Sequence, residues 1–219
     1  MSHAAPPPGH AAPKDGRRQR LIETTLDTLA DYGYVGTTLA RIAARADISP
    51  ALLVHYFGDK DRLMEAAFRA LAARLSAGVS ARLQMARGAR ARVQAVIDAN
   101  LAPEAFTPRV GAVWLAFWGQ VVHAPRLRRV QTVHQRRMLS NLCQPLRAVM
   151  PAEQARQLAA MIAALIDGVW LHAALSEWRE ADSEAARAMI AALLDSRFWQ
   201  EPEPASAIRT SSTIACRSP

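Results

Sequence analysis

The sequence predicts an all-α protein, in which a three-helix N-terminal head with a helix-turn-helix precedes a larger helical bundle. Apolar residues recur at helical spacing along most of the 219 residues, and no segment shows a convincing strand-like alternation. Prolines fall between these periodic segments, where helices tolerate them. The run of residues 37–63 adds the caps and turn of two short helices followed at once by a third.

Composition divides the chain into a central periodic region and two terminal segments without periodicity. The N-terminal segment is rich in Ala, Pro and Gly, so we expect disorder there, and we expect the same of the C-terminal segment. The segments are a disordered arm (1–15), the head (16–63, with its motif at 38–57), the helical body (64–199) and a disordered tail (200–219).

The first helix of the head is expected from about Arg17 to Tyr32, and Gly33 suits its C-cap. In the body, periodicity and proline positions predict six more helices. Their expected ranges are 59–85, 90–101, 107–122, 126–149, 152–178 and 183–198.

The two-helix motif is defined by its caps. Thr37 suits an N-cap, because its hydroxyl can accept a hydrogen bond from a free amide at the start of a helix. Asp47 is expected in the turn, Ser49 caps the next helix, and Pro50 occupies its first position, where the missing N–H costs nothing. Gly58 ends that helix. A short helix held in this way fits the major groove of DNA, although an ordinary hairpin in an all-α core has a similar pattern.

The motif predicts two classes of contact with double-stranded DNA. A helix N-terminus with a lysine beside it suits a phosphate, and small or apolar residues on the outer face of the second helix suit base edges. The candidates for base edges are Ser49, Pro50, Ala51 and Val54, and those for phosphates are Thr38, His55, Tyr56 and Lys60. The formal charge of +8 agrees with an anionic partner, although an arginine-rich proteome can give the same balance.

The same run resembles the DNA-binding region of the tetracycline-repressor family, and it departs from that pattern at Asp47 and Ala51, where relatives often have glycine. Asp tolerates a left-handed backbone better than most residues do. The resemblance implies a helical regulatory domain with a ligand cavity between its helices. The matching residues are Thr38, Ile42, Ala43, Ala46, Ser49, His55, Tyr56, Phe57, Lys60 and Leu63.

Tryptophan is concentrated in two segments of a body that is otherwise poor in aromatic residues. Trp114 and Trp118 share a helix face beside Phe117, and Asp167 lies close to Trp170 in a nearly apolar helix. A buried carboxylate needs a partner. Aromatic faces with a carboxylate suit a quaternary ammonium ion, for which Glu104 is a second acidic candidate; the alternative is that the tryptophans only fill the core.

Three strings in the body sharpen the resemblance: WLAFW (114–118), RRMLSNL (136–142) and IDGVWLHAALS (166–176). They are similar to the choline-responsive repressors of glycine betaine synthesis within the same family, and with the head the similarity covers about residues 17–178. It implies a repressor whose small-molecule effector is choline. A regulator of the same family that senses hydrophobic drugs and controls an efflux pump is the alternative.

The remaining expectations concern assembly and exclusions. One short helix contacts too few base pairs for a specific site, so we expect a homodimer through helix 158–175 with Ile190, Leu193 and Leu194. No motif of an enzyme, cofactor site or metal site is found, so none of these is predicted. Two cysteines and the absence of a signal peptide or a membrane span of about 18 apolar residues predict a cytoplasmic protein.

Overall fold

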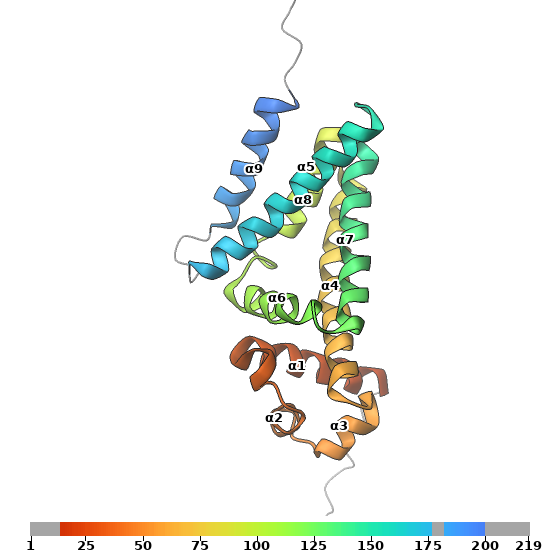
Figure 1. The fold of residues 1–219 in the computed structure, drawn as a ribbon, viewed down its shortest axis with the longest axis vertical. Coiled ribbons are helices and arrows are strands. Elements are labelled where there is room, and N and C mark those ends of the chain that lie inside the picture. Colours follow the sequence, from red (N-terminus) through yellow and green to blue (C-terminus); the bar gives the residue numbers. More distant parts are fainter. Residues whose placement is uncertain (1–13, 177–181, 200–219) are drawn as a thin grey trace, which may run out of the picture.

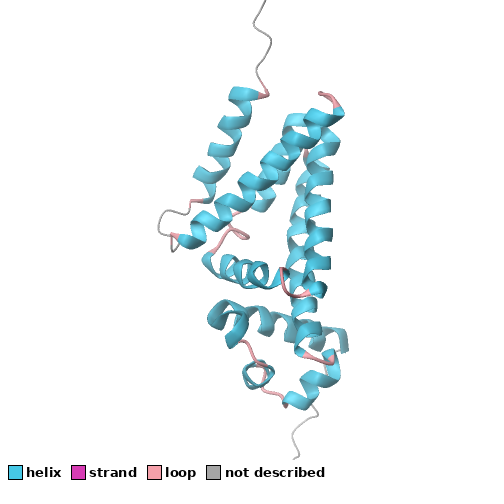
Figure 2. Ribbon diagram, in the orientation of Figure 1, coloured by secondary structure: helices cyan, strands magenta, loops and turns pink. Residues whose placement is uncertain are grey.

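The structure, a computed structural model, describes residues 14–176 and 182–199, and within these ranges it consists of helices without a strand (Figure 1 and Figure 2). The all-α prediction is therefore confirmed. The helices are α1 (Lys14–Gly36), α2 (Leu39–Arg45), α3 (Pro50–Phe57), α4 (Lys60–Met85), α5 (Gly88–Asn100), α6 (Pro108–Val121), α7 (Pro125–Leu146), α8 (Ala152–Leu175) and α9 (Ser183–Arg197).

Helix α1 starts within the expected N-terminal arm and is interrupted where its end was expected. It begins at Lys14, and Gly33 has a positive φ of 64°, a conformation that glycine adopts without strain. The last turn before Gly36 therefore lies across a kink. The rest of the expected arm, and the expected tail at 200–219, lie outside the described residues.

The cap of α2 corrects the sequence prediction. Thr38, not Thr37, is the N-cap, and its hydroxyl accepts a hydrogen bond from the Arg41 amide at 3.1 Å. Thr37 is fully buried and donates its hydroxyl hydrogen to the Gly33 carbonyl at 2.6 Å. Either threonine could cap a helix by residue type, and the burial of Thr37 decides between them.

The turn between α2 and α3 has the predicted geometry. Asp47 has φ 51° and is the one non-glycine residue in the described ranges with a positive φ. The Ser49 hydroxyl accepts a hydrogen bond from the Leu52 amide at 3.2 Å, and Pro50 opens α3. Gly58 then ends α3 with φ 86°, so that α4 begins directly after it.

Helices α4 and α7 form the long axis of the molecule and lie side by side (Figure 1). Helix α6 crosses them and packs both against α1 of the head and against α8 of the body. A single apolar interior runs through both parts. Its largest fully buried side chains are Leu29, Ile42, Leu53, Leu63, Met64, Phe68, Ile97, Leu101, Phe117, Leu127, Leu142 and Leu146.

The observed body helices follow the predicted ranges to within three residues as far as the described residues reach. Pro145 lies in the last turn of α7, close to the end of that helix at Leu146. The predicted boundary between head and body at residue 63 falls inside α4, which runs without interruption from Lys60 to Met85. A movement of α4 in the body is therefore also a movement of its N-terminus in the head.

The helices expected at the dimer interface, α8 and α9, have a mixed environment. Ile190 and Leu194 are buried within this single chain, so the prediction that they face a partner is wrong. Leu193 is 43% exposed, and several other large apolar residues of the two helices are exposed to a similar or greater extent. These exposed residues are Met161, Leu171, Leu175 and Met189.

Helix α8 is long and apolar enough, by length and composition, to cross a membrane. It also supplies side chains to the protein core, among them Ile162, Ile166 and Trp170, and packs against α6 and α7. A single helix of this kind is common in the core of a soluble protein.

Candidate functional site

The outer face of α3 is exposed and largely apolar. Leu53 and Phe57 are buried and hold the helix against the head, so the opposite face must point outward. All four residues predicted to meet base edges are exposed. Pro50, Ala51 and Val54 lie on this face of α3, with Val54 43% exposed, and Ser49 is the N-cap of the helix.

The residues predicted to contact phosphates divide into two groups. Thr38 and His55 are exposed, and although the Thr38 hydroxyl accepts the capping hydrogen bond, its own hydrogen is free to be donated to an anion. Tyr56 is half-buried, and its ring meets that of His55 edge to face at 5.8 Å between centroids. Thr38 lies at the N-terminus of α2, and His55 and Tyr56 lie near the C-terminus of α3.

Lys60 has an intramolecular partner that the sequence did not indicate. Its ammonium group donates a hydrogen bond to the Tyr34 carbonyl at 3.1 Å and lies 4.8 Å from the centre of the Tyr34 ring. Burial lowers the pKa of Lys60, and the nearby Asp61 carboxylate partly opposes that effect. Lys60 therefore fastens the start of α4 to the segment before α2, and two of its three N–H donors remain for a phosphate.

A basic groove lies beside the turn of the motif. It has a volume of about 460 Å³ and lies between α1 and the α2–α3 turn. Its charged lining consists of Arg17, Arg20, Arg45 and Asp47. Arg17 and Arg20 are close together in the sequence of α1, but the contribution of Arg45 depends on the packing of α2 against α1.

Four of the predicted ligand-binding residues meet in the body. Trp114 and Trp118 from α6 and Asp167 and Trp170 from α8 line one small void of about 10 Å³. Helical spacing places Trp114 with Trp118 and Asp167 with Trp170, and the packing of α6 against α8 brings the two pairs together. The other lining residues are Leu75, Asn100, His134 and Ile166.

The aromatic rings of this void are close to one another. Trp114 lies 5.8 Å from Trp118 and 5.2 Å from His134, measured between ring centroids. The Trp170 indole donates a hydrogen bond to the Asn100 carbonyl at 3.2 Å, which fixes the ring on the far wall. His134 and Asn100 come from α7 and α5, and no spacing in the sequence connects them with the tryptophans.

Glu104 lines a second pocket, of about 280 Å³, which shares Leu75, Trp114 and Trp170 with the inner void. Its carboxylate forms an ion pair with Arg82 at 2.9 Å and is mostly exposed. The two spaces are therefore adjacent, with the pair of tryptophans between them. Glu104 is placed at the outer pocket and not beside Asp167.

Phe117 has a different environment from the other predicted ligand-binding residues. It is fully buried and stacks on Phe68, with 4.6 Å between ring centroids. It lines neither the inner void nor the outer pocket. Its position supports Trp114, since Phe68 also meets that indole edge to face at 5.3 Å.

The electrostatics of the inner void favour a cation. Burial raises the pKa of Asp167 to about 6, and no hydrogen bond or ion pair with another described residue stabilises its charge. Burial, with a smaller effect of Arg137, lowers the pKa of His134 to about 4, so this ring is neutral near pH 7. An anionic carboxylate with three indoles and a neutral imidazole can bind an organic cation once the void opens.

A larger cavity, of about 550 Å³, lies between α8 and α9. Its lining is mainly apolar and includes Phe106, Leu165, Val169, His172 and Met189. No pattern in the sequence indicates this cavity, because it depends on how α9 packs across α8. No cluster of three His, Cys, Asp or Glu side chains that could hold a metal ion is found among the described residues.

Two family models match the chain, one for each part of the fold. Residues 21–67 match the model of bacterial regulatory proteins of the tetR family. Residues 89–198 match the C-terminal domain of BetI-type transcriptional repressors. The first range covers most of the head, and the second contains Trp114, Trp118, Asp167 and Trp170.

Curated relatives agree with both matches. The chain is 46% identical over 161 residues to the HTH-type transcriptional regulator BetI of Burkholderia mallei (strain NCTC 10229), which covers 73% of this chain and 83% of the relative. The regulator of the same name from Paraburkholderia xenovorans (strain LB400) gives the same identity and coverage.

Solved structures share the fold. A transcriptional regulator from Pseudomonas aeruginosa PAO1 matches with a TM-score of 0.75 and 28% identity, over 84% of this chain and 91% of the other. A transcriptional regulator from Saccharomonospora viridis, solved in complex with choline, matches with a TM-score of 0.73 and 22% identity, over 84% and 98% of the two chains.

Proposed function

This chain belongs to the tetR family of bacterial regulatory proteins and has the C-terminal domain of the BetI-type transcriptional repressors, and we propose that it represses the genes for converting choline to glycine betaine, with choline as its effector. Its relatives are transcriptional regulators and not enzymes. The proposal has two parts, a ligand site in the body and a DNA-binding face in the head, which act inside the cell.

The observation that most supports choline is the environment of Asp167. This carboxylate faces a void lined by Trp114, Trp118 and Trp170 and lacks a cationic partner among the described residues. A trimethylammonium group would supply that charge and would place its methyl groups against the indole faces. The choline bound to the Saccharomonospora viridis regulator is a ligand of this chemistry.

Estimated energies agree with such a ligand. Two or three desolvated cation–π contacts at about 2 kcal/mol each give about 4–6 kcal/mol, which corresponds to a Kd from roughly millimolar to tens of micromolar. The ion pair with Asp167 adds to this. Glycine betaine has the same cationic group but also a carboxylate, which Asp167 and Glu104 would repel, so we expect it to bind more weakly.

Binding requires the inner void to open. Its volume of about 10 Å³ is too small for a trimethylammonium group, whereas the adjacent pocket holds about 280 Å³. Because Trp114 lines both spaces, whereas Trp170 is held by its hydrogen bond to Asn100, a rotation of the Trp114 indole would join them. Ligand binding would then move the helices that hold the rings, α6 and α8.

On the DNA side, we propose that a homodimer places two α3 helices in successive major grooves, about 34–36 Å apart. The exposed apolar residues of α8 and α9, among them Leu171 and Leu175, would form the interface. Base edges would be contacted by Ser49, Pro50 and Ala51, and phosphates by residues such as Lys60. Few of these groups form hydrogen bonds with bases, so recognition would depend partly on DNA shape.

The cavity between α8 and α9 supports one alternative function. Its apolar lining and volume of about 550 Å³ suit a hydrophobic drug, as expected for a regulator of an efflux pump in the same family. Such a ligand needs no carboxylate. The charge of the effector therefore discriminates between the two functions.

A titration of operator binding tests the choline proposal. DNA selected from a randomised duplex library by the wild-type protein supplies the operator, and choline is compared with its neutral isostere, in which a quaternary carbon replaces the nitrogen. We expect choline alone to change operator affinity, and Asp167→Asn to abolish its effect. Equal effects of choline and the isostere would contradict the cation site and favour the apolar cavity.

A further inference from the structure

Helix α6 connects the tryptophan-lined void with the head. Trp114 lies in its middle and Trp118 in its last turn, and Arg109 lies in its first turn, beside α1. The helix start is fixed, because the Thr107 hydroxyl accepts a hydrogen bond from the Val110 amide at 3.3 Å. A displacement of the tryptophans is therefore also a displacement of Arg109, as in any short rigid helix.

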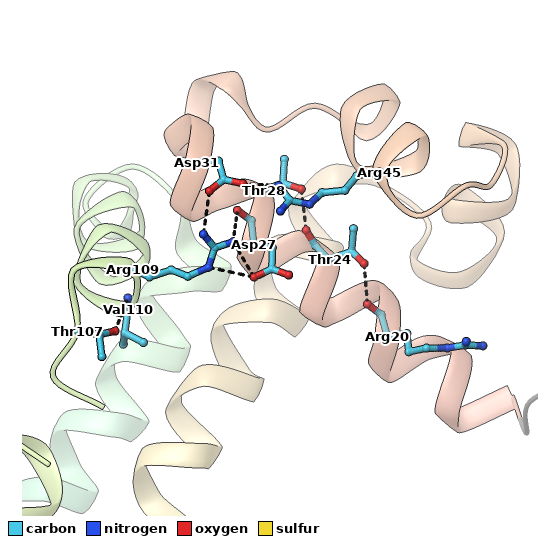
Figure 3. A network of polar contacts seen from close by, with 9 residues as sticks. All are labelled: Arg20, Thr24, Asp27, Thr28, Asp31, Arg45, Thr107, Arg109 and Val110. Atoms are coloured by element: carbon cyan, nitrogen blue, oxygen red, sulfur yellow. Dashed lines mark hydrogen bonds and ion pairs between the residues drawn. The ribbon is translucent and has the colours of Figure 1, made fainter. Parts of the chain in front are cut away.

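The Arg109 guanidinium binds two carboxylates on α1 at once (Figure 3). Its Nη2 and Nε donate to Asp27 Oδ1 at 2.8 and 3.2 Å, and its Nη1 donates to Asp31 Oδ1 at 2.9 Å. A fourth hydrogen bond, at 3.3 Å, goes from Nη2 to the Asp27 carbonyl. The guanidinium group is a planar fork of N–H donors, and it can form all of these hydrogen bonds only in a narrow range of positions.

Asp31 extends the connection into the helix-turn-helix. Its other oxygen, Oδ2, accepts a hydrogen bond from the guanidinium of Arg45 at the end of α2, and the two side chains form an ion pair. Asp31 is therefore a shared acceptor between an arginine of the body and an arginine of α2 (Figure 3). Asp27 contacts Arg109 without such an extension.

We propose that Arg109 is a positioning residue for ligand regulation, which transmits the position of α6 to helix α2 through Asp31. The inference rests on the proposed function, since it takes the tryptophan-lined void as the place where the effector acts. When the void opens, α6 shifts, the fork loses its fit to the two carboxylates, and Asp31 is free to follow Arg45. The orientation of α2 on DNA then changes.

A role of the Arg109 ion pairs in fold stability and a role in positioning predict different results for an Arg109 variant. The side chains of Arg109, Asp27 and Asp31 are 35–49% exposed, and exposed ion pairs contribute little to stability. Arg109→Gln should therefore leave the thermal unfolding midpoint almost unchanged. A positioning role instead predicts a loss of communication between the ligand site and the DNA site.

The first test measures operator affinity with and without choline for wild type and three variants. We expect Arg109→Gln and Asp31→Asn to reduce the ratio of the two affinities by about fivefold or more, because coupling factors of this kind are typically 5–150. Choline should bind these variants in the absence of DNA at least as tightly as it binds wild type, since Arg109 does not line the void and the exposed ion pairs that break on opening contribute little. Arg109→Lys keeps the charge but not the fork and should restore the ratio only in part.

The chain offers two matched controls. Asp27→Asn removes one acceptor of Arg109 but leaves the connection through Asp31 to Arg45, so it should reduce the ratio less than Asp31→Asn does. Arg156→Gln removes an exposed ion pair with Glu153 that is local to α8, and it should have no effect. Equal effects of Asp27→Asn and Asp31→Asn would contradict transmission through Asp31.

A second test needs no ligand. Amide hydrogen exchange should be faster in α2 for Arg109→Gln than for wild type, and unchanged for Arg156→Gln. If wild type does not respond to choline but exchange in α2 is faster, the proposed effector is wrong and the connection is supported. If Arg109→Gln responds to choline as wild type does, or if its exchange in α2 is unchanged, the connection is wrong whatever the effector.

Discussion

Asp167 is a residue whose burial is unfavourable without a ligand. Its carboxylate is largely removed from water, and no described residue supplies a compensating charge, so its pKa rises from an ordinary value of 3.8 to about 6. Groups with such shifts are concentrated at functional sites. A bound cation would offset the free-energy cost of burying the Asp167 carboxylate, because it supplies the missing positive charge.

We expect Asp167→Asn to stabilise the ligand-free protein at neutral pH. Since the folded-state pKa is raised, the stability due to the protonated carboxyl is fully present below the ordinary pKa of 3.8 and is lost as the pH rises through about 6. Asparagine carries no charge and avoids that loss, by about 1–2 kcal/mol after a discount for partial exposure. Urea unfolding measures the difference, which should vanish near pH 4; a less stable variant at neutral pH would refute this.

Choline affinity should fall as the pH is lowered through about 6, because protonation of Asp167 removes the anion that the ligand needs. The other groups of the site keep their charge in this range: His134 is neutral above its pKa of about 4. A hydrogen bond from its own amide and the Arg82 guanidinium lower the pKa of Glu104. Tryptophan fluorescence titrations should show a limiting loss of about tenfold per pH unit, and a constant affinity between pH 5 and 8 would argue against Asp167.

Asp47 is strained in the turn of the DNA-binding motif, because its φ of 51° places a side chain in the left-handed region. Asp47→Gly should raise the stability by up to about 1 kcal/mol, and Asp47→Val should lower it by about 1–2 kcal/mol, since a β-branched residue is least tolerated there. Thermal unfolding of the two variants measures both. If valine were as stable as glycine at this position, the strain would not exist.

At the scale of the helices, caps and prolines in the sequence were enough to place nearly every element. Such signals act locally, within one turn of the chain, and so they are visible without the fold. The sequence predictions were wrong where the role of a side chain depends on the residues that it packs against in the fold. Thr37 and Thr38 can both cap a helix, and the apolar residues Ile190 and Leu194 pack equally well against the same chain or another.

The exposed stripe on α8 gives a prediction at this scale. Leu171→Glu should convert the dimer to a monomer and weaken operator binding by about 100-fold or more, because the second head no longer binds as part of the same molecule. Analytical ultracentrifugation and gel shift measure the two effects. Met85→Glu, at an even more exposed apolar residue at the end of α4, is the control and should remain a dimer. A dimeric Leu171→Glu would place the interface elsewhere.

At the scale of the whole molecule, the site depends on packing that no local pattern encodes. The sequence indicated Trp114, Trp118, Asp167 and Trp170, and these residues meet at one void. It did not indicate His134, which comes from α7. It also did not separate Phe117, on the same apolar helix, from the tryptophans, because spacing alone does not show which part of a buried face borders a cavity.

The long connections between the two parts explain how a small ligand could act on DNA. Helix α4 is continuous from the head into the body, and α6 packs against α1 and carries Trp114 and Trp118. A coupling of about 1–3 kcal/mol between the sites is enough to change operator occupancy many-fold. Two packed helices with discrete contacts can supply it without any unfolding.

A crystal structure of the protein with choline tests the central claim most directly. We expect the ammonium nitrogen within about 6 Å of the ring centres of Trp114, Trp118 and Trp170 and next to Asp167, with the inner void opened into the outer pocket. Choline in the cavity between α8 and α9, with the inner void still closed, would contradict this account.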